Sequence, residues 1–452
     1  MSDELPNGWV KITLQDSGAW RSGGTPSRRN PDYFGKGIAW VKSGDLPDGP
    51  ILKTDEQITK LGLENSAAKL MPAGTISMAL YGATIGKLGF MTFPAATNQA
   101  CANVVPDTRL VEPQFLFNYL FSERRNFIEQ GQGGAQPNIS QEIVRSHPFP
   151  LAPLAEQRRI VAKLEKLLGQ VDACQQRLEK LPTLLKRFRQ SVLAAACSGR
   201  LTADWREKNP DAVPYAVDAE SDVEADEDFP PKWKVTRLGA LTAHVTSGSR
   251  GWAEYYADSG STFIRAQNIN ADFLDLEDIA FVRPPAGAEG LRTKVQQHDI
   301  LVTITGANVT KSAVVEKPIE DAYVSQHVAL VRLKDVSLSQ FLFHSVVGPA
   351  HGRKQLLAAA YGQGKPGLNL GNIRDVVIGL PPLAEQQEIV RRVAGLFALA
   401  GQLEQRLAQA RKQVDKLTPS LLARAFAGQL VPQNPTDEPA EKLLERIKRE
   451  KP

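Results

Sequence analysis

The sequence predicts an α+β fold: two mixed, mainly β domains joined by two long helices that pair as an antiparallel coiled coil, related by a pseudo-twofold internal repeat. Three observations predict it. The second half of the 452-residue chain repeats the first, short β-rich runs fill the first part of each copy, and an unbroken heptad pattern fills the second part.

The repeat consists of matching segments at a nearly constant offset. LPNGWVKITL at 5–14 matches FPPKWKVTRL at 229–238, and YGATIGK at 81–87 matches TGANVTK at 305–311, both at an offset of 224. PLAEQRRIV at 153–161 matches PLAEQQEIV at an offset of 229, so the drift indicates small loop insertions. The chain therefore contains two copies of one architecture.

The first part of each copy is mainly β. Residues 1 to about 150 and 229 to about 380 contain runs such as GTISMALYG and HDILVTITG, broken by Gly, Pro and Asn. Helical segments are fewer there, and QFLFNYLFSERRNFIEQ is the clearest.

The second part of each copy, 153–197 and 382–427, begins after a proline and predicts a long helix of roughly 65 Å. Apolar residues alternate at spacings of four and three, which is typical of a coiled-coil seam, and the two seams most simply pair with each other. The alternative is that each helix lies separately on its own β domain. The predicted interface residues are Ile160, Leu164, Leu167, Val171, Leu178, Leu185, Ile389, Val393, Leu396, Leu403, Leu407 and Val414.

Two prolines interrupt these helices. Pro182 lies inside the first seam, where a kink or a break is expected near Leu181. The matching residue of the second copy is Arg411, so that helix can run straight until Pro419, which should perturb its last turns.

The composition is that of a globular chain, with 42% hydrophobic and 23% charged residues, which excludes collagen-like, coil-only and disordered classes. No stretch approaches the roughly 18 apolar residues that span a bilayer, and the acidic start lacks a signal-peptide pattern, so we expect a cytoplasmic protein with no membrane partner. The three cysteines form no CxxC pattern and are expected to be reduced and buried, with neither a disulfide framework nor a zinc site.

The charge is unevenly distributed. Residues 209–231 carry eight acids and no base, a composition typical of a solvated linker. Without this run the net charge of the chain rises from +4 to +12, which favours a polyanionic partner, although simple solubility is the alternative.

These features together resemble the specificity subunit of type I restriction-modification systems. The resemblance rests on the two PLAEQ-started helices ending in LAAACSGRLTADWRE and LARAFAGQLVP, the repeated tryptophan-containing openings, the GATIGK-like motif and the tail EPAEKLLERIKREK, and it covers essentially the whole chain. It implies target recognition domains at 1–150 and 232–380. It also implies a central helical region at 151–200, an acidic linker at 201–231, a C-terminal helical region at 381–431 and an amphipathic tail at 432–452.

The resemblance further implies that each recognition domain reads one half of a bipartite, asymmetric double-stranded DNA target and that the coiled coil sets the unread spacer. It implies two modification (methyltransferase) subunits docked on this chain, and restriction subunits. S-adenosylmethionine, ATP and Mg²⁺ are expected on those partner subunits and no cofactor on this chain. The exposed helix faces and the tail around Leu443, Leu444 and Ile447 are candidate docking surfaces, with ordinary solvated surface as the alternative.

The residues themselves also argue against catalysis by this chain. GATIGK at 82–87 has three residues between its glycines and Leu88 after its lysine, whereas a phosphate loop needs four and a hydroxyl. The segment 30–33 reads NPDY rather than the NPPY of adenine methyltransferases, no cofactor loop is nearby, and the six histidines form no metal-ligand cluster. A fused enzyme is therefore disfavoured, and a coiled-coil adaptor with protein-binding β modules is the alternative function.

Candidate DNA contacts follow from the residue types that bind phosphates and base edges. The first domain offers Arg21, Thr25, Arg28, Arg29, Tyr33, Lys36, Lys42, Tyr81, Thr84 and Lys87. The second offers Arg250, Trp252, Tyr255, Arg265, Gln267, Asn268, Thr305, Asn308 and Lys311. Solvated loops and structural turns are the alternatives. The loops differ between the copies while the frames agree, as expected if the domains read different half-sites.

Overall fold

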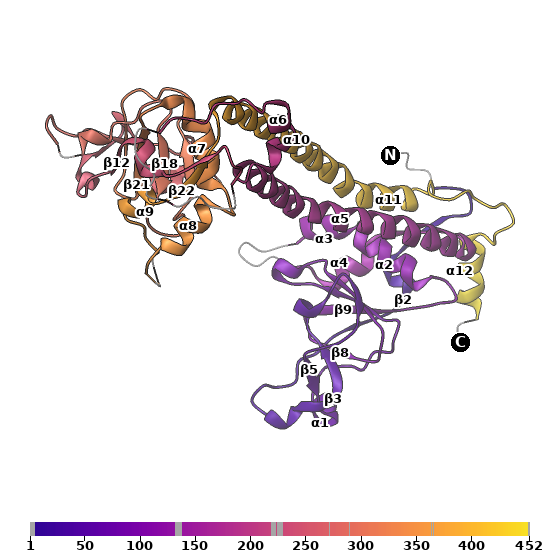
Figure 1. Cartoon of the computed structure of the whole chain (residues 1–452). Coiled ribbons are helices and arrows are strands. Elements are labelled where there is room, and N and C mark those ends of the chain that lie inside the picture. The colour runs from indigo at the N-terminus through magenta and orange to yellow at the C-terminus, as the bar shows by residue number, and fades with distance from the viewer. Residues whose placement is uncertain are drawn as a thin grey trace. The chain divides into compact units, whose positions relative to one another are not determined.

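The structure is a computed structural model, and it describes residues 5–131, 138–217, 223, 229–270, 272–288, 290–362, 364 and 366–450. The chain forms two compact units: unit 1 comprises Met1–Glu179 and Gln409–Pro452, and unit 2 comprises Lys180–Ala408. Each unit contains one mainly β domain and the adjoining parts of two long helices (Figure 1).

The β domain of unit 1 holds sheets in the orders β2-β9-β6-β7-β4, β5-β3-β8 and β1-β10. The strands are β1 (Val10–Thr13), β2 (Gly18–Ser22), β3 (Phe34–Val41), β4 (Gly49–Ile51), β5 (Glu56–Ile58), β6 (Ile76–Ala79), β7 (Leu88–Met91), β8 (Ala96–Thr97), β9 (Cys101–Pro106) and β10 (Pro148–Leu151). The helices are α1 (Lys60–Glu64), α2 (Pro113–Ser122), α3 (Arg124–Glu129), α4 (Gln141–Ser146), the start of α5 (Leu154–Cys197), α11 (Leu417–Phe426) and α12 (Ala440–Arg449).

The β domain of unit 2 holds sheets in the orders β12-β21-β18-β19, β13-β17-β14-β20, β15-β16 and β11-β22. The strands are β11 (Lys234–Arg237), β12 (Thr242–Ser247), β13 (Tyr256–Ala257), β14 (Ser261–Ile264), β15 (Ile269–Asn270), β16 (Phe273–Leu274), β17 (Ala280–Val282), β18 (Ile300–Thr303), β19 (Ser312–Val314), β20 (Ala322–Val324), β21 (Val328–Leu333) and β22 (Val377–Leu380). The helices are α6 (Ala203–Lys208), α7 (Ser339–Val347), α8 (Gly352–Ala359), α9 (Leu370–Arg374) and most of α10 (Leu383–Asp415).

The two domains share one topology, which confirms the predicted repeat. The order β2-β9-β6-β7 recurs as β12-β21-β18-β19, and the parallel pair of β3 with β8 recurs as β14 with β20. The register recurs too, since Val10 faces Leu151 in β1-β10 and Lys234 faces Leu380 in β11-β22. The offsets of 224 and 229 seen in the sequence are therefore structural equivalences.

The central strands β6 and β18 are buried on both faces, because each lies between two hydrophobic cores. Ile76 and Met78 of β6 face the core built around α2, whereas Ala79 faces the core under β3. Alternate residues of a strand point to opposite faces, so an all-apolar run such as GTISMALYG is what this position requires. The continuous β-rich runs of the sequence are therefore the central strands.

Each β domain is tied to its long helix by a buried hydrogen bond between an indole and a carboxylate. Trp9 Nε1 donates to Glu156 Oε2 at 3.1 Å, and Trp233 Nε1 donates to Glu385 Oε2 at 3.0 Å. All four side chains are buried. Because both groups lose water on folding, the bond satisfies the indole N–H and one carboxylate oxygen, and it fixes the helix on its domain.

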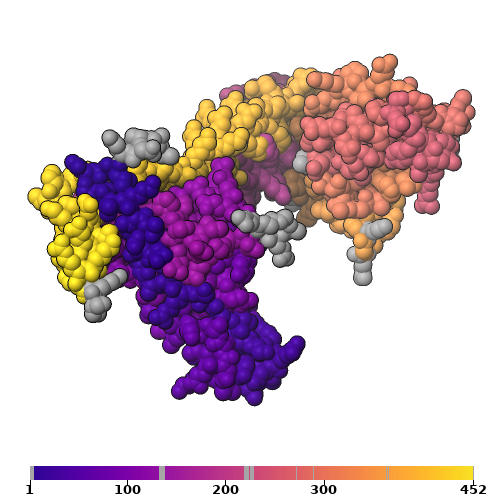
Figure 2. Space-filling model, turned by 180° about the vertical axis from the view of Figure 1, so that it is seen from behind, coloured from indigo at the N-terminus to yellow at the C-terminus, as the bar shows by residue number. Residues whose placement is uncertain are grey.

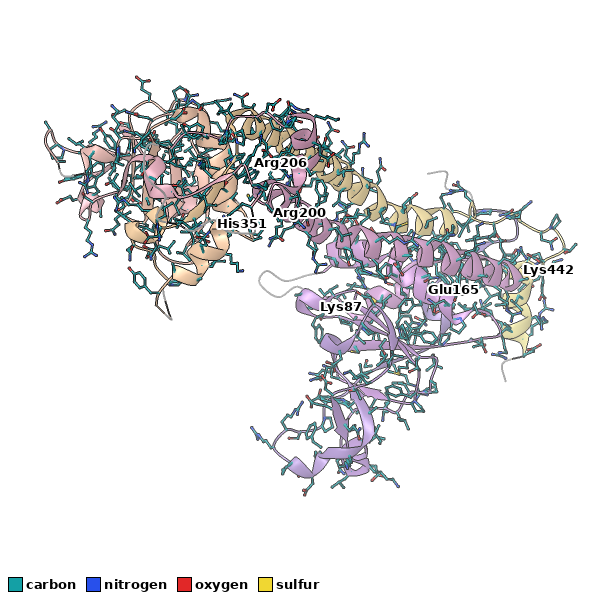
Figure 3. The ribbon with its side chains drawn as sticks, in the orientation of Figure 1. Lys87, Glu165, Arg200, Arg206, His351 and Lys442 are labelled. Carbon is teal, nitrogen blue, oxygen red and sulfur yellow. The ribbon has the colours of Figure 1, made fainter. Side chains whose placement is uncertain are left out.

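The two bonds differ at the second carboxylate oxygen. Glu385 also accepts a hydrogen bond from Thr202 Oγ1 at 2.8 Å and forms an ion pair with Arg206, labelled in Figure 3, at 2.5 Å. Glu156 Oε1 is buried with no hydrogen-bond partner in the described part of the chain, and burial raises the pKa of the Glu156 carboxyl. The first copy cannot form the equivalent ion pair, because Pro435 aligns with Arg206.

The helices run antiparallel within each unit, as predicted. In unit 2, the guanidinium of Arg189 on α5 pairs with Glu404 on α10, and α6, which follows α5, pairs with the start of α10 through Asp204 and Arg392. In unit 1, α11 packs beside the first turns of α5 in one core (Figure 1). From Arg189 to Asp204 the residue numbers rise, whereas those of their partners fall from Glu404 to Arg392, which is the pattern of antiparallel helices.

The predicted seam is buried at its ends and open in its middle. Ile160 and Leu164 lie in the core of the β domain of unit 1, and Ile389 and Val393 in that of unit 2. Each helix therefore also lies on its own β domain, which was the alternative to mutual pairing. Among the predicted residues, the buried ones are Ile160, Leu164, Val171, Ile389, Val393 and Leu407, the partly buried ones are Leu167, Leu178, Leu185, Leu396 and Val414, and Leu403 is exposed.

Helix α5 is continuous through its proline. The sequence predicts a kink or a break near Leu181. The prediction of a break is wrong, because α5 includes Pro182 in its interior. A proline cannot donate to the carbonyl four residues earlier, which here is Leu178. Arg411 Nη2 donates to that carbonyl at 3.0 Å, and Arg411 is the residue that the repeat aligns with Pro182. The guanidinium of Arg411, in the second copy, therefore supplies to Leu178 the hydrogen bond that Pro182, in the first copy, cannot donate.

The perturbation predicted at Pro419 is confirmed. Helix α10 ends at Asp415, and α11 begins at Leu417. Asp415 lies four residues before Pro419, where the proline ring clashes with the helix carbonyl and supplies no N–H. No side chain replaces this bond among the interactions described for Asp415, and the helix is interrupted there.

The tail helix α12 packs on unit 1. Leu443 and Ile447 are buried in the core of the unit, and the backbone N–H of Ala440 donates to the carbonyl of Gly8 at 2.9 Å. Figure 2 shows the yellow tail against the indigo start of the chain. The apolar face of the tail is therefore occupied within the chain and does not remain open for a docking partner; Leu444 is partly buried beside it.

Two remaining expectations have mixed outcomes. Cys101 and Cys197 are free and buried, and burial raises the pKa of each thiol to about 12. Cys174 is exposed on α5, so the expectation that all three are buried is wrong. Residues 218–222 and 224–228, which hold seven of the eight acids of the run 209–231, lie outside the described residues.

The unequal Trp–Glu contacts predict unequal effects of removing each carboxylate charge. Glu156→Gln keeps an oxygen for Trp9 and removes a poorly paired charge, so the free energy of unfolding should stay unchanged or rise at pH 7.5. Glu385→Gln leaves Arg206 without its carboxylate and should cost about 2 kcal/mol. Urea unfolding of the two variants measures the difference.

The Trp9–Glu156 contact also predicts that the free energy of unfolding depends on pH. Since the pKa of Glu156 is raised above its ordinary value of 4.5, the folded chain binds more protons than the unfolded chain above that pH. This carboxyl therefore makes stability fall as pH rises from 4.5, and Glu156→Gln should remove that contribution. Equal losses for both variants at pH 7.5, with unchanged pH dependence, would contradict the assignment.

Candidate nucleic-acid interface

Each β domain presents two turns that carry predicted contact residues. The first turn is the three-ten turn Ser43–Asp45 in unit 1 and Ala266–Asn268 in unit 2. The second turn spans residues 81–87 in unit 1 and 305–311 in unit 2. Both turns lie at equivalent places in the two domains, so each domain carries one copy of the same frame.

A cation precedes the first turn in both units. The backbone N–H of Lys42 donates to Asp45 Oδ2 at 3.0 Å, and that of Arg265 donates to Asn268 Oδ1 at 3.0 Å. Lys42 and Arg265 are therefore structurally equivalent, although the sequences around them differ. The side chain of Asn268 is buried and also donates to the carbonyls of Asp275 and Asp278, so its amide is used inside the domain.

Both cations meet an acid from a later segment of their own domain: Glu56 is the first residue of β5, and Asp278 lies between β16 and β17. Lys42 Nζ lies 2.8 Å from Glu56 Oε1, and this hydrogen bond raises the pKa of Lys42 and lowers that of Glu56. Arg28 reaches the other oxygen of Glu56 at 2.6 Å. In unit 2, Arg265 lies 3.4 Å from Asp278 Oδ2.

These counter-charges orient the cations on the domain. The guanidinium carbon of Arg28 also lies 4.4 Å from the centroid of the Phe34 ring, a cation–π contact that holds the side chain beside the ring. Gln267 donates to Asp278 Oδ2 at 2.9 Å, which adds a second group to the same acid. Sequence reasoning missed Glu56 and Asp278, because acids 14 and 13 residues after their cations carry no local signal.

The backbone of the second turn is held by the same hydrogen bonds in the two units. The carbonyl of Lys87 accepts from the Ala79 N–H at 2.9 Å, and the carbonyl of Lys311 accepts from the Thr303 N–H at 2.8 Å. Thr84 Oγ1 donates to the carbonyl of Tyr81 at 2.8 Å, which closes the turn on itself. The turn therefore presents its side chains from a fixed backbone.

In unit 2 the second turn also contacts the first. Asn308 Nδ2 donates to the carbonyl of Ala266 at 3.2 Å, and Lys311 Nζ donates to Asn270 Oδ1 at 3.3 Å. Thr305 is partly buried at the base of this turn. The two candidate segments of unit 2, which these bonds join over separations of 42 and 41 residues, thus form one surface.

The remaining candidates divide by exposure. Trp252 is buried in a core with Phe263, where the two rings stack 5.7 Å apart, and Tyr255 packs on the same indole. Thr25 is exposed and hydrogen-bonded to Gln99, Tyr33 and Lys87 are partly buried, and Tyr81 is exposed. The exposed arginines and lysine that pair with no acid among the described residues are Arg21, Arg29, Lys36 and Arg250.

Two further properties of the described residues bear on the class of site. No group of three or more His, Cys, Asp or Glu side chains in the described ranges could hold a metal ion. No helix of those ranges is long and apolar enough to cross a membrane. The chain thus contains two copies of one β domain. Each copy carries two turns with basic side chains and adjoins parts of two antiparallel helices. This arrangement defines the class as a duplicated binding protein.

Comparison with known proteins identifies the family. The model of the "Type I restriction modification DNA specificity domain" matches residues 6–183 and 287–410, more than half of the chain. The chain belongs to this family, and its role is that of a DNA target specificity subunit.

Two specificity subunits match this chain over nearly its whole length. The chain is 28% identical over 441 residues to the "Type I restriction enzyme EcoBI specificity subunit" of Escherichia coli, covering 95% of this chain and 87% of that relative. It is 27% identical to the EcoKI specificity subunit of Escherichia coli K12, covering 99% and 96%.

Solved structures share the fold. A chain from work described as the "Structural basis underlying complex assembly and conformational transition of the type I R-M system" superposes with a TM-score of 0.69 at 19% identity, covering 94% of this chain and 99% of that one. The "HsdS subunit from Thermoanaerobacter tengcongensis" gives a TM-score of 0.59 at 18% identity, covering 95% and 99%.

The equivalent cations yield a matched prediction. Lys42→Ala and Arg265→Ala should each weaken binding of the assembled complex to its target duplex, because each removes a cation held at the candidate surface. If the lost contact is to a phosphate, the slope of log affinity against log salt should fall by about 0.9. A KCl titration measures the slope.

Arg449→Ala on the tail is the control, since its side chain is 82% exposed and lies on α12 rather than on the β domain. Unchanged affinity, slope and methylation pattern in Lys42→Ala and Arg265→Ala would mean that these turns are not the reading surface.

Proposed function

We propose that each β domain reads one half of a bipartite, asymmetric DNA target. The observation that carries this proposal is a shared frame with divergent side chains. Lys42 and Arg265 precede equivalent turns, and the second turns have the same backbone bonds, yet Tyr81 is replaced by Thr305 in the other copy. Two readers with one frame and different contact groups suit two different half-sites.

The groups proposed to meet DNA are the exposed and half-buried polar residues of the turns. Trp252 and Asn268 are left out of this set, because their side chains are buried and used within the domain. Phosphate contacts by the paired cations require exchange of Glu56 or Asp278 for a phosphate, which leaves the cation satisfied in both states. These residues would therefore give the domain affinity for DNA and fix its position along the duplex.

The helix pair is proposed to set the unread spacer and to dock two modification subunits, with restriction subunits joining the complex. Apolar side chains along it support docking, since they stay 36% to 53% exposed in unit 2: Leu181, Leu184, Phe188, Leu399 and Leu403. Exposed apolar groups gathered on a helix pair are typical of an interaction surface. The docking surface thus lies on the helices rather than on the buried face of the tail.

The chain itself is proposed to be non-catalytic. S-adenosylmethionine, ATP and Mg²⁺ would bind the partner subunits, and this chain would bring them to the target. The candidate turns support this division, because they offer cations, amides and hydroxyls for binding and contain no paired carboxylates for general acid–base chemistry or metal binding.

Mapping of adenine methylation tests the proposal. The chain is co-expressed with its modification subunit, and genomic adenine methylation is read by long-read sequencing. The expected result is a bipartite, asymmetric motif with a fixed gap that disappears when this chain is omitted. A short continuous motif, or methylation that does not depend on this chain, would overturn the proposal.

A further inference from the structure

Two aspartates that the repeat aligns share a backbone conformation that residues with side chains rarely adopt. Asp48 has φ +62° and Asp272 has φ +65°, both in the left-handed region, and the repeat aligns them at an offset of 224. Aspartate tolerates this region better than most residues, but it is uncommon outside glycine. A conformation kept at both aligned positions calls for a common cause.

The carboxylates of these aspartates hold the second turn. Asp48 Oδ1 accepts a hydrogen bond from the backbone N–H of Leu88 at 2.9 Å, and Asp272 Oδ1 accepts one from that of Ser312 at 3.2 Å. Leu88 directly follows Lys87, and Ser312 directly follows Lys311. In each unit, the aspartate therefore fixes the peptide group on the C-terminal side of the lysine.

A helix arginine completes the contact on the other side. Arg124, at the start of α3, forms a two-pronged ion pair with Asp48, and its Nε donates to the carbonyl of Gly86 at 2.8 Å. Arg353, in α8, pairs with Asp272 in the same way, and its Nη2 donates to the carbonyl of Thr310 at 3.2 Å. Each arginine thus fixes the peptide on the N-terminal side of the lysine.

The residue before each lysine is itself in the left-handed region. Gly86 has φ +77°, and a Cβ there would lie 2.8 Å from Arg124 Cγ. The second copy has Thr310 at φ +71°, a β-branched residue that disfavours this conformation. Strain of this kind persists only where the surroundings impose it, and such positions cluster at functional sites.

The two networks therefore form matching clamps, defined as Asp48 with Arg124 in unit 1 and Asp272 with Arg353 in unit 2. The side chains are 21% to 30% exposed, so the ion pairs are half-buried and screened less than surface pairs. A pair that served only to join a helix to a loop would not need to bracket one residue. Both clamps bracket the lysine of the second turn.

We propose that the clamps are positioning elements for DNA reading: each fixes the backbone on both sides of Lys87 or Lys311 so that the lysine meets DNA from a preset position. This rests on the proposed contact of the second turn with DNA. It adds that Arg124 and Arg353 act through the lysine rather than by touching DNA. Since each clamp lies within one unit, each serves its own half-site.

A double-mutant cycle tests the clamp of unit 1. The complex of this chain with its modification subunits is titrated with a duplex carrying the mapped motif, using Lys87→Ala, Arg124→Met and the double variant. Lys87→Ala should lower affinity about fivefold and the salt slope by about 0.9. Arg124→Met should lower affinity by a similar factor, and the double variant should bind no more weakly than either single one, because the two changes remove the same contact.

The matched control is Arg125→Met. Arg125 is the next residue of α3, its side chain is 90% exposed, and it pairs with Glu129 instead of the clamp. It should bind as the unchanged protein does. Arg353→Met with Lys311→Ala repeats the cycle in unit 2, and each cycle should change discrimination against a scrambled duplex at its own half-site only.

The outcomes separate the clamp from the function beneath it. If Lys87→Ala and Lys311→Ala leave affinity and slope unchanged, the contact of the second turn with DNA is wrong. A different result would overturn the proposal: Lys87→Ala weakens binding, and the double variant binds more weakly than either single variant by the product of their two losses. The clamp would then not act through the lysine.

A gentler variant covers a failure of Arg124→Met to assemble. Asp48→Asn keeps an oxygen for the Leu88 N–H and a residue that tolerates the left-handed backbone, while it weakens the ion pair. It should give an intermediate loss of affinity that disappears in the Lys87→Ala background. A loss that persists in that background would also overturn the proposal.

Discussion

The buried bond between an indole and a carboxylate is the contact on which the rest of the architecture depends. Trp9 stands at the start of one β domain and Glu156 in the first turn of α5, and the second copy repeats the contact with Trp233 and Glu385. The bond joins the residue just before the first strand of the domain to the helix that follows its last strand. It thereby fixes the direction in which each long helix leaves its domain.

The helix pair then depends on compensation between the copies. The repeat places Pro182 opposite Arg411 in alignment, and the guanidinium supplies the bond that the proline removes from Leu178. A duplicated sequence has freedom to diverge in this way, because a defect in one copy can be offset by the aligned residue of the other. The second long helix has no such compensation described at Asp415 and is interrupted there.

The fold could be predicted from the sequence because its signals are long and duplicated. A heptad pattern that runs through several turns of each long helix and a repeated strand pattern survive local irregularities. The candidate site could be predicted only in part. Lys42 and Arg265 were found by residue type, but their partners Glu56 and Asp278 are set by tertiary contacts, and the burial of Trp252 depends on packing that loop composition does not encode. The Asp–Arg contacts were missed for the same reason.

The central claim is that each domain carries its own half of the specificity on a common frame. Replacing residues 233–380 with a second copy of residues 9–151, the segments that the strand registers of β1-β10 and β11-β22 make equivalent, tests this most directly. Methylation by the resulting complex should occur at two inverted copies of the first half-site across a gap. Retention of the second half-site in the methylated motif would contradict the claim.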